Sequence, residues 1–178
     1  MSDRPPQHPL MPRAQYDEWL KSLPEELCTF CEWQDYQIVL ASTNHWLWIL
    51  NRSPYWKYHT MLIPRRHVVE MSDLSVVETG ELFTIYAIAV DALRNFQSNL
   101  PEGERTGKYI FFWRFRSEVD AEVSDQRKLS HFHLHLAPDR ERMFDPLLDK
   151  DAHEVDYIPL LNIAKRLPSQ VNTIYNGS

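Results

Sequence analysis

The run of residues 131–137 alternates histidine with apolar side chains, and it restricts the fold more than any other part of the 178-residue chain. Side chains of a β-strand point alternately to its two faces, so the histidines are expected together on one face. The apolar residues between them are expected on the other face, where they would anchor the strand in a core. The three histidines are His131, His133 and His135.

Five segments in all have the composition of strands, and a long helix separates the third from the fourth. Apolar residues at helical spacing place this helix at about residues 74–97, and shorter helices are expected near residues 14–22 and 160–167. The five expected strands are residues 36–41, 46–50, 59–64, 109–116 and 131–137. This order predicts an α+β fold with a mainly antiparallel five-stranded sheet and one long helix packed on it.

The length of the chain predicts one compact domain with short terminal extensions. Its first residues are polar and rich in proline, so we expect a mobile N-terminal extension with a short helix over residues 1–24. The domain itself is expected at residues 25–140, and a C-terminal extension at residues 141–178.

Charge and hydropathy exclude several classes of partner. A net charge of −6 leaves no global basic field for a long nucleic acid, although a local cluster could still hold a small anion. No apolar run is long enough to cross a bilayer, and the first residues lack the apolar region of a signal peptide. We therefore expect a cytoplasmic protein that binds neither nucleic acid nor a membrane.

Three imidazoles on one strand face permit three interpretations. A neutral imidazole is a nucleophile at neutral pH, so the middle histidine could attack an α-phosphate while its neighbours stabilise charge or pass a proton. The same residues could instead ligate a catalytic zinc ion, or form a polar sheet face without chemistry. The spacing alone favours the first interpretation only slightly.

The two cysteines of the chain, Cys28 and Cys31, form a Cys-x-x-Cys pair. In a reducing compartment such a pair is more typical of a metal half-site or a redox motif than of a structural disulfide. Two reduced, buried cysteines without a ligand are the remaining alternative.

The histidine run resembles the signature of the histidine-triad (HIT) family, His-φ-His-φ-His-φ-φ, where φ is an apolar residue. Residues 50–67, Leu-Asn-Arg-Ser-Pro-Tyr-Trp-Lys-Tyr-His-Thr-Met-Leu-Ile-Pro-Arg-Arg-His, are similar to a second segment of that family, Asn-x-x-Pro-x-x-x-x-His-x-φ-φ-φ-Pro-x-x-His. The resemblance covers about residues 27–138. It implies the family's α+β fold and a nucleotidyl hydrolase or transferase that forms a covalent nucleotidyl-histidine intermediate.

The resemblance also implies roles for four residues. His133 would be the nucleophile, and His135 would contact the α-phosphate. Asn51 would contact the ribose, and His59 would face the strand that carries the triad. Asn51 could alternatively serve the turn that follows it, and His59 could be a surface histidine.

One branch of the family, related to the galactose-1-phosphate uridylyltransferases, binds zinc through a Cys-x-x-Cys pair and two histidines. The matching residues here are Cys28, Cys31, His67 and His131. A closed set of two cysteines and two histidines is typical of a structural zinc site, and it would fix the orientation of His131.

Residues 114–130 depart from the family pattern because they contain no glycine, whereas many members have a glycine-containing run that holds the phosphates. Phosphate contacts are expected instead from Arg114, Arg116 or Lys128, with a hydroxyl from Ser130. The alternative is that these cations form salt bridges with the acidic residues of the same stretch.

The family resemblance further implies a homodimer. It implies nucleotide substrates, namely nucleoside phosphoramidates, dinucleoside polyphosphates or nucleotide sugars. A metallohydrolase with a His-ligated zinc, and a non-catalytic nucleotide-binding module on the same fold, stay open as alternatives.

Overall fold

The computed structural model describes residues 10–24, 26–32, 37–102, 105, 109–113, 131–138, 152–154 and 156–166. In this part of the chain, five strands form one antiparallel sheet in the order β1-β2-β3-β5-β4. They are β1 (Val39–Ser42), β2 (Trp46–Leu50), β3 (Thr60–Pro64), β4 (Tyr109–Phe112) and β5 (Leu134–Pro138). The predicted α+β class and the five-stranded antiparallel sheet are confirmed.

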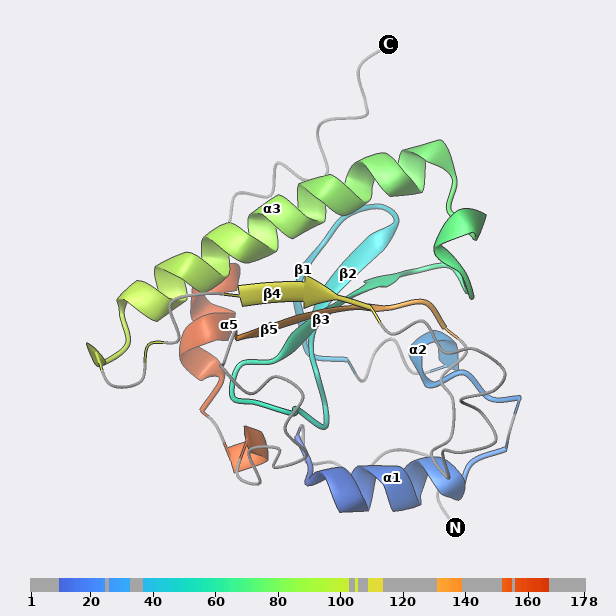
Figure 1. Ribbon diagram of the computed structural model, residues 1–178, viewed down its shortest axis with the longest axis horizontal. Coiled ribbons are helices and arrows are strands. Elements are labelled where there is room, and N and C mark those ends of the chain that lie inside the picture. The colour runs from blue at the N-terminus through green and yellow to red at the C-terminus, as the bar shows by residue number, and fades with distance from the viewer. Residues whose placement is uncertain are drawn as a thin grey trace.

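The helices lie on both sides of this sheet. The long helix α3 (Val76–Ser98) crosses one side, whereas α1 (Arg13–Lys21) and the short α2 (Thr29–Glu32) lie on the other (Figure 1). Helix α5 (Ile158–Ala164) packs against α3 and β1. Two single-turn 3₁₀ helices, η2 (Met71–Asp73) and η4 (Ala152–Glu154), complete the described elements.

Alternate residues of the central strands face two separate cores. The larger core contains Trp46, Trp48, Leu50, Leu62, Phe132, Leu134 and Leu136 with residues of α3 and α5. The smaller core contains Leu47, Ile49, Met61 and Ile63 with Phe30 of α2. Fully burying one such side chain contributes about 1.5–3 kcal/mol. The two cores therefore fix which face of each strand points to α3 and which points to α2. The apolar residues of the histidine run lie on the α3 face, as predicted, which leaves the α2 face for the histidines.

The strand that carries the histidines is shorter than predicted. It was expected at residues 131–137, but β5 begins at Leu134, which pairs with Leu62 of β3. The next hydrogen-bonded pair along β3 would involve Pro64. The carbonyl oxygen of Pro64, however, already accepts from Nε2 of His131 at 2.9 Å. The chain before β5 is held by Phe132, whose amide donates to the carbonyl of Val68. Two of the three histidines therefore precede the strand.

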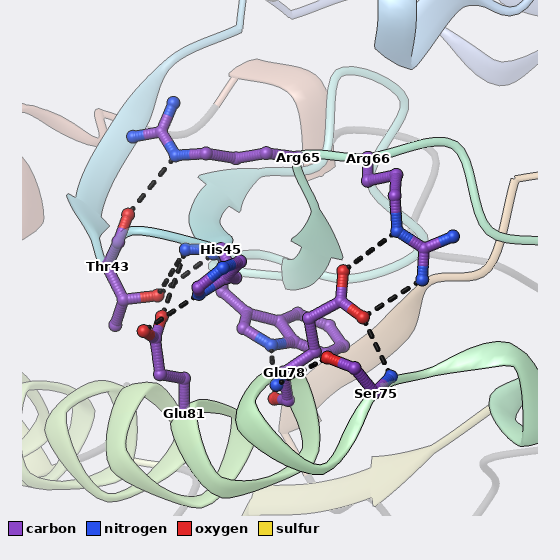
Figure 2. Close-up of polar contacts among 8 residues, drawn as sticks. Thr43, His45, Arg65, Arg66, Ser75, Glu78 and Glu81 are labelled. Carbon is purple, nitrogen blue, oxygen red and sulfur yellow. Dashed lines mark hydrogen bonds and ion pairs between the residues drawn. The ribbon is translucent and has the colours of Figure 1, made fainter.

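Two buried carboxylates join the beginning of α3 to the sheet (Figure 2). Ser75 caps the helix: its Oγ accepts from the amide of Glu78 at 3.2 Å, and Glu78 Oε2 accepts from the amide of Ser75 at 2.8 Å. Glu78 also accepts from Arg66 Nε at 3.0 Å and Nη2 at 2.9 Å. One turn later, Glu81 accepts from the ring and the amide of His45 at 2.8 and 2.9 Å. The Arg66 guanidinium lowers the pKa of Glu78 to about 2, so this carboxylate is ionised at neutral pH.

The terminal segments contribute to the packed structure. Leu10 and Met11 are buried, and the amide of Met11 donates to the carbonyl of Arg52 at 2.8 Å. At the other end, Leu160 and Ala164 of α5 belong to the larger core. The apolar residues of the N-terminal segment, Met11, Tyr16, Leu20 and Leu23, form a small cluster of their own, and the bond from Met11 links it to the domain. The expected mobility of residues 1–24 stays a prediction. The division at residues 25–140 stays a prediction.

Among the helices that the structure describes, none combines the length and the apolar character needed to cross a membrane.

Candidate active site

His133 lies just before β5, and a main-chain carbonyl fixes the position of its proton. Its Nδ1 is 2.7 Å from the carbonyl oxygen of His131. A carbonyl can only accept, so Nδ1 carries the proton and the lone pair of the neutral ring lies on Nε2. The ring of Phe30 lies beside it, with centroids 5.6 Å apart. Nε2 is therefore the nucleophilic nitrogen of a neutral His133.

A backbone amide fixes the tautomers of His59 and His135, both of which are buried. The amide of Tyr55 donates to His59 Nδ1 at 3.2 Å, so a neutral His59 carries its proton on Nε2. His59 Nε2 lies 2.9 Å from His135 Nδ1 and donates to it. A neutral His135 then carries its own proton on Nε2. The structure thus brings His59 to the triad and makes His135 Nε2 a hydrogen-bond donor.

Asn51, which directly follows β2, contacts the ring of His59. Its Oδ1 accepts from the amide of Ser53 at 3.0 Å, and its Nδ2 is 3.2 Å from His59 Nδ1. Only 7% of Asn51 is exposed, so its amide orients His59. The ribose contact expected for Asn51 stays a prediction.

The residue before His59 has a strained backbone. Tyr58 has a φ of 64°, a left-handed conformation that costs a residue other than glycine about 1 kcal/mol. It directs the Tyr58 ring to Phe96 of α3, with centroids 4.5 Å apart, whereas His59 meets His135. The strain sits at the point where the chain enters the site.

Two aromatic rings that we did not predict flank the imidazole pair. Phe112 of β4 is stacked on His135, with centroids 4.8 Å apart and an angle of 17°. Tyr55 is stacked on His59, with centroids 5.2 Å apart and an angle of 30°. Phe112 lies in an expected strand, but its role depends on the strand order that sets β4 beside β5. No local pattern carries that order.

The beginning of α1 contacts one of these two rings, that of Tyr55. The guanidinium carbon of Arg13 lies over the ring of Tyr55, 5.2 Å from its centroid, and Arg13 is also paired with Asp17 at 2.8 Å. Tyr16 of the same helix is buried, which raises its pKa to about 12 and keeps it neutral. In the sequence, Arg13 and Asp17 have the spacing of an ordinary exposed helix pair, so nothing indicated this contact.

The four predicted metal ligands lie together, with their ligand atoms all within 4.8 Å of one another. His131 Nδ1 is 3.3 Å from Cys28 Sγ and 3.4 Å from Cys31 Sγ, and His67 Nδ1 is 3.4 Å from Cys31 Sγ. Tetrahedral zinc with ordinary bond lengths requires sulfur–nitrogen separations of about 3.6 Å. The chemistry and spacing of this donor set therefore fit Zn²⁺.

The protonation of two residues in this cluster also fits a bound cation. Burial, together with the hydrogen bond and the charge of Cys28, raises the pKa of Cys31 to about 12. Burial also lowers the pKa of His131 to about 4, which keeps this imidazole neutral. Two neighbouring thiolates would therefore need a bound cation, whereas the imidazole is already in its ligating form.

His131 connects the cysteine cluster to His133. Its Nε2 donates to the carbonyl of Pro64 at 2.9 Å, which leaves the lone pair on Nδ1, the atom that faces the two sulfurs. Its own carbonyl accepts the Nδ1 proton of His133. One residue thus combines a predicted metal ligand with the group that fixes the tautomer of the predicted nucleophile.

The remaining predicted site residues, Arg114, Arg116, Lys128 and Ser130, lie outside the described residues. Their phosphate contacts stay predictions.

Comparison with solved structures identifies the fold. A zinc-bound histidine triad family protein from Mycobacterium smegmatis is 20% identical, with a TM-score of 0.55, over 81% of this chain and 97% of that one. A hypothetical histidine triad nucleotide-binding protein from Sulfolobus tokodaii is 16% identical, with a TM-score of 0.57, over 84% of this chain and 100% of that one. A HIT family protein from Bacillus anthracis is 23% identical, with a TM-score of 0.50, over 79% and 94%.

No protein with a curated description matches the chain. The family model of the HIT domain matches residues 32–142, which is more than half of the chain. The two histidine-containing segments and the antiparallel sheet lie within this match. The chain therefore belongs to the HIT domain family.

Proposed function

We propose that this chain is a nucleotidyl hydrolase or transferase that works through a covalent intermediate on His133. The observation that carries the proposal is the complementary protonation of two neighbouring imidazoles. His133 has its lone pair on Nε2 and His135 has its proton on Nε2, and the ring centroids are 4.9 Å apart. A nucleophile and a hydrogen-bond donor side by side suit attack on a phosphate group.

In the proposed first step, His133 Nε2 forms a bond to the α-phosphorus of a nucleotide, and the bond from phosphorus to the leaving group breaks. The Nδ1 proton stays on the ring, where the His131 carbonyl stabilises the positive charge that develops as the bond forms. His135 Nε2 donates a hydrogen bond to a non-bridging phosphate oxygen. Phosphoryl chemistry of this kind depends mainly on positioning and charge stabilisation.

In the second step, water or another acceptor attacks the phosphorus, any proton of the attacking oxygen leaves to the solvent, and the nitrogen–phosphorus bond breaks. Water gives a nucleoside monophosphate, which is hydrolysis, whereas a phosphate or sugar phosphate acceptor gives transfer. His133 returns to its neutral form with the proton on Nδ1. Nucleoside phosphoramidates, dinucleoside polyphosphates and nucleotide sugars all contain the α-phosphate and the leaving group that these steps need.

We further propose that Zn²⁺ occupies the cluster of Cys28, Cys31, His67 and His131 in a structural role. The separations within the cluster support this, and the Mycobacterium smegmatis protein with the same fold is zinc-bound. In the described part of the chain, this is the one group of potential metal ligands, and neither His133 nor His135 belongs to it. This separation favours nucleotidyl chemistry over a metallohydrolase that uses the three histidines as ligands.

The activity is tested by incubating purified protein with adenosine phosphoramidate, diadenosine polyphosphates and nucleotide sugars, each with and without a phosphate acceptor. We expect at least one of them to release a nucleoside monophosphate or a transfer product, at a rate proportional to protein concentration. Binding of these nucleotides with no turnover of any would contradict the proposal and favour the non-catalytic binding module.

We also propose that the chain forms a homodimer. Between Val76 and Val90 the only charged residues of α3 are Glu78 and Glu81, and both are buried against the sheet. The outward face is apolar instead, with Phe83 66% exposed. Tyr86, one turn further on, contacts Phe111 of β4, the strand at one end of the described sheet. An uncharged helix face beside a strand edge is suited to pairing with a second copy.

Replacing Phe83 by glutamate should convert the dimer to a monomer, because it places a charge in the apolar face. Light scattering coupled to size exclusion measures the mass. Arg94→Glu is the control, because Arg94 is exposed on the same helix beyond the uncharged stretch. A wild-type protein that is monomeric at micromolar concentration would contradict the homodimer.

A further inference from the structure

Among the four predicted zinc ligands, His67 is the exposed one, and it lies in the connection that follows β3. Cys28 directly precedes the short helix α2 and Cys31 lies within it, and His131 is buried with its ring anchored on Pro64. The position of His67 must therefore come from the main chain on either side of it. A zinc site binds tightly when its ligands are held in place before the metal arrives.

Arg66, the residue before His67, is tied to the beginning of α3 (Figure 2). Its Nε and Nη2 donate to the two oxygens of Glu78 at 3.0 and 2.9 Å, and Nη2 also donates to the carbonyl of Asp73 at 2.9 Å. Two parallel bonds between a guanidinium and a carboxylate fix direction as well as distance. On the other side of His67, the carbonyl of Val68 accepts from the amide of Phe132.

Glu78 is itself held by burial and by hydrogen bonds, so it can fix the position of the Arg66 guanidinium. Its side chain is 5% exposed, and its Oε2 accepts from the amide of Ser75 at 2.8 Å. Its carbonyl accepts from the indole Nε1 of Trp46 at 2.7 Å, which fixes this turn of α3 to β2 in the main core. The ion pair therefore connects the segment that contains His67 to a turn of α3 that is hydrogen-bonded to Trp46 of the larger core.

We propose that Glu78 and Arg66 are positioning residues for the zinc site, which hold the main chain of His67 so that its imidazole meets Cys31 and His131. Neither side chain contacts the cysteines or the ring of His67 in the described contacts, so the effect passes through the chain. This inference rests on the proposed zinc site and does not depend on the nucleotidyl chemistry.

A matched control lies one turn further along α3. Glu81 is also buried, at 5% exposed, and also binds a partner through both oxygens. Its partner is His45 in the connection between β1 and β2. This connection reaches the segment before His67 through Arg65, whose amide donates to the carbonyl of His45 and whose Nε donates to the carbonyl of Thr43. Glu81 itself makes no described bond to residues 65–68. A substitution of Glu81 should thus match the general cost of losing a buried carboxylate at the beginning of α3, with a much smaller effect on His67.

The experiment compares wild type, Glu78→Gln and Glu81→Gln as full-length proteins. Zinc is removed, and its dissociation constant is measured by competition with a chromophoric chelator, with circular dichroism of each variant recorded as a check of folding. We expect Glu78→Gln to weaken zinc binding roughly 10-fold or more, and Glu81→Gln to change it by less than about threefold. If Glu78→Gln fails to fold, Arg66→Lys replaces it, because lysine keeps the charge and removes the paired geometry.

Equal weakening in the two glutamine variants would overturn the inference, because it would mean a general loss of stability. Zinc binding of wild-type strength in Glu78→Gln or Arg66→Lys would overturn it as well. A wild-type protein that binds no zinc would overturn the zinc site and this inference together, whether or not it turns over nucleotides. The opposite result, turnover absent but Glu78→Gln selectively weak for zinc, would leave this inference standing while the proposed activity fails.

Discussion

Replacing His133 by alanine should lower kcat for nucleotide turnover at least about 10⁴-fold, while the zinc content and the melting temperature stay close to those of the wild type. Alanine removes the nitrogen that forms the bond to phosphorus, and no other group in the described site has a lone pair fixed at that place. The ring of His133 is only partly buried and ligates nothing in the cysteine cluster, so the fold should tolerate its loss.

The measurement is steady-state turnover of whichever nucleotide the wild type accepts, together with metal analysis and a melting curve. His45→Gln is the control, since it removes a histidine that binds Glu81 of α3, the helix on the side of the sheet opposite α2 (Figure 1). A kcat within about tenfold of the wild type would show that another group attacks the phosphate. Loss of zinc in His133→Ala would indicate instead that the triad itself ligates the metal.

Replacing Cys28 and Cys31 together by serine should abolish zinc binding and lower the melting temperature by about 10 °C or more. A ligand present at 1,000 times its dissociation constant contributes about 4 kcal/mol to the folded state, and in a protein of this size 1 kcal/mol shifts the melting temperature by about 2–4 °C. Activity should fall as well, because the His131 ring would keep only its hydrogen bond to Pro64, and its carbonyl would hold the Nδ1 proton of His133 less firmly.

The check is a melting curve of the wild type with and without a chelator, beside the double variant, and zinc analysis of each. The wild type without zinc should behave like the double variant, and added zinc should restore only the wild type. Equal stability of the metal-free and metal-bound wild type would remove the structural role from the cluster.

The alternation in residues 131–137 correctly predicted that the apolar residues and the histidines lie on opposite faces of the sheet, because side chains of a strand point alternately to its two faces. Leu134 and Leu136 lie in the large core as expected, and His135 faces the other side. The same alternation could not show that pairing with β3 begins only at Leu134. That limit comes from Pro64, whose carbonyl is occupied by the side chain of His131, a contact between residues 67 positions apart.

The resemblance to a family located residues that no spacing rule could bring together. It predicted that Cys28, Cys31, His67 and His131 would meet, and the structure places them in one cluster. It could not predict the contribution of α1, because that helix ends at Lys21, before the resemblance begins at about residue 27. The stacking of Tyr55 and Phe112 on the imidazoles was missed for a different reason, since it depends on a turn and on the strand order.

The central claim is that the nucleotidyl group is held on His133 Nε2, and mass spectrometry of the protein during turnover tests it most directly. Wild-type protein is mixed with a nucleotide that it turns over, quenched within milliseconds in alkaline denaturant to preserve a nitrogen–phosphorus bond, digested and sequenced. We predict one nucleotidyl group on the peptide that contains residues 131–138, attached to His133, and no such adduct in His133→Ala. Turnover without any adduct, or an adduct on His131 or His135 instead, would contradict it.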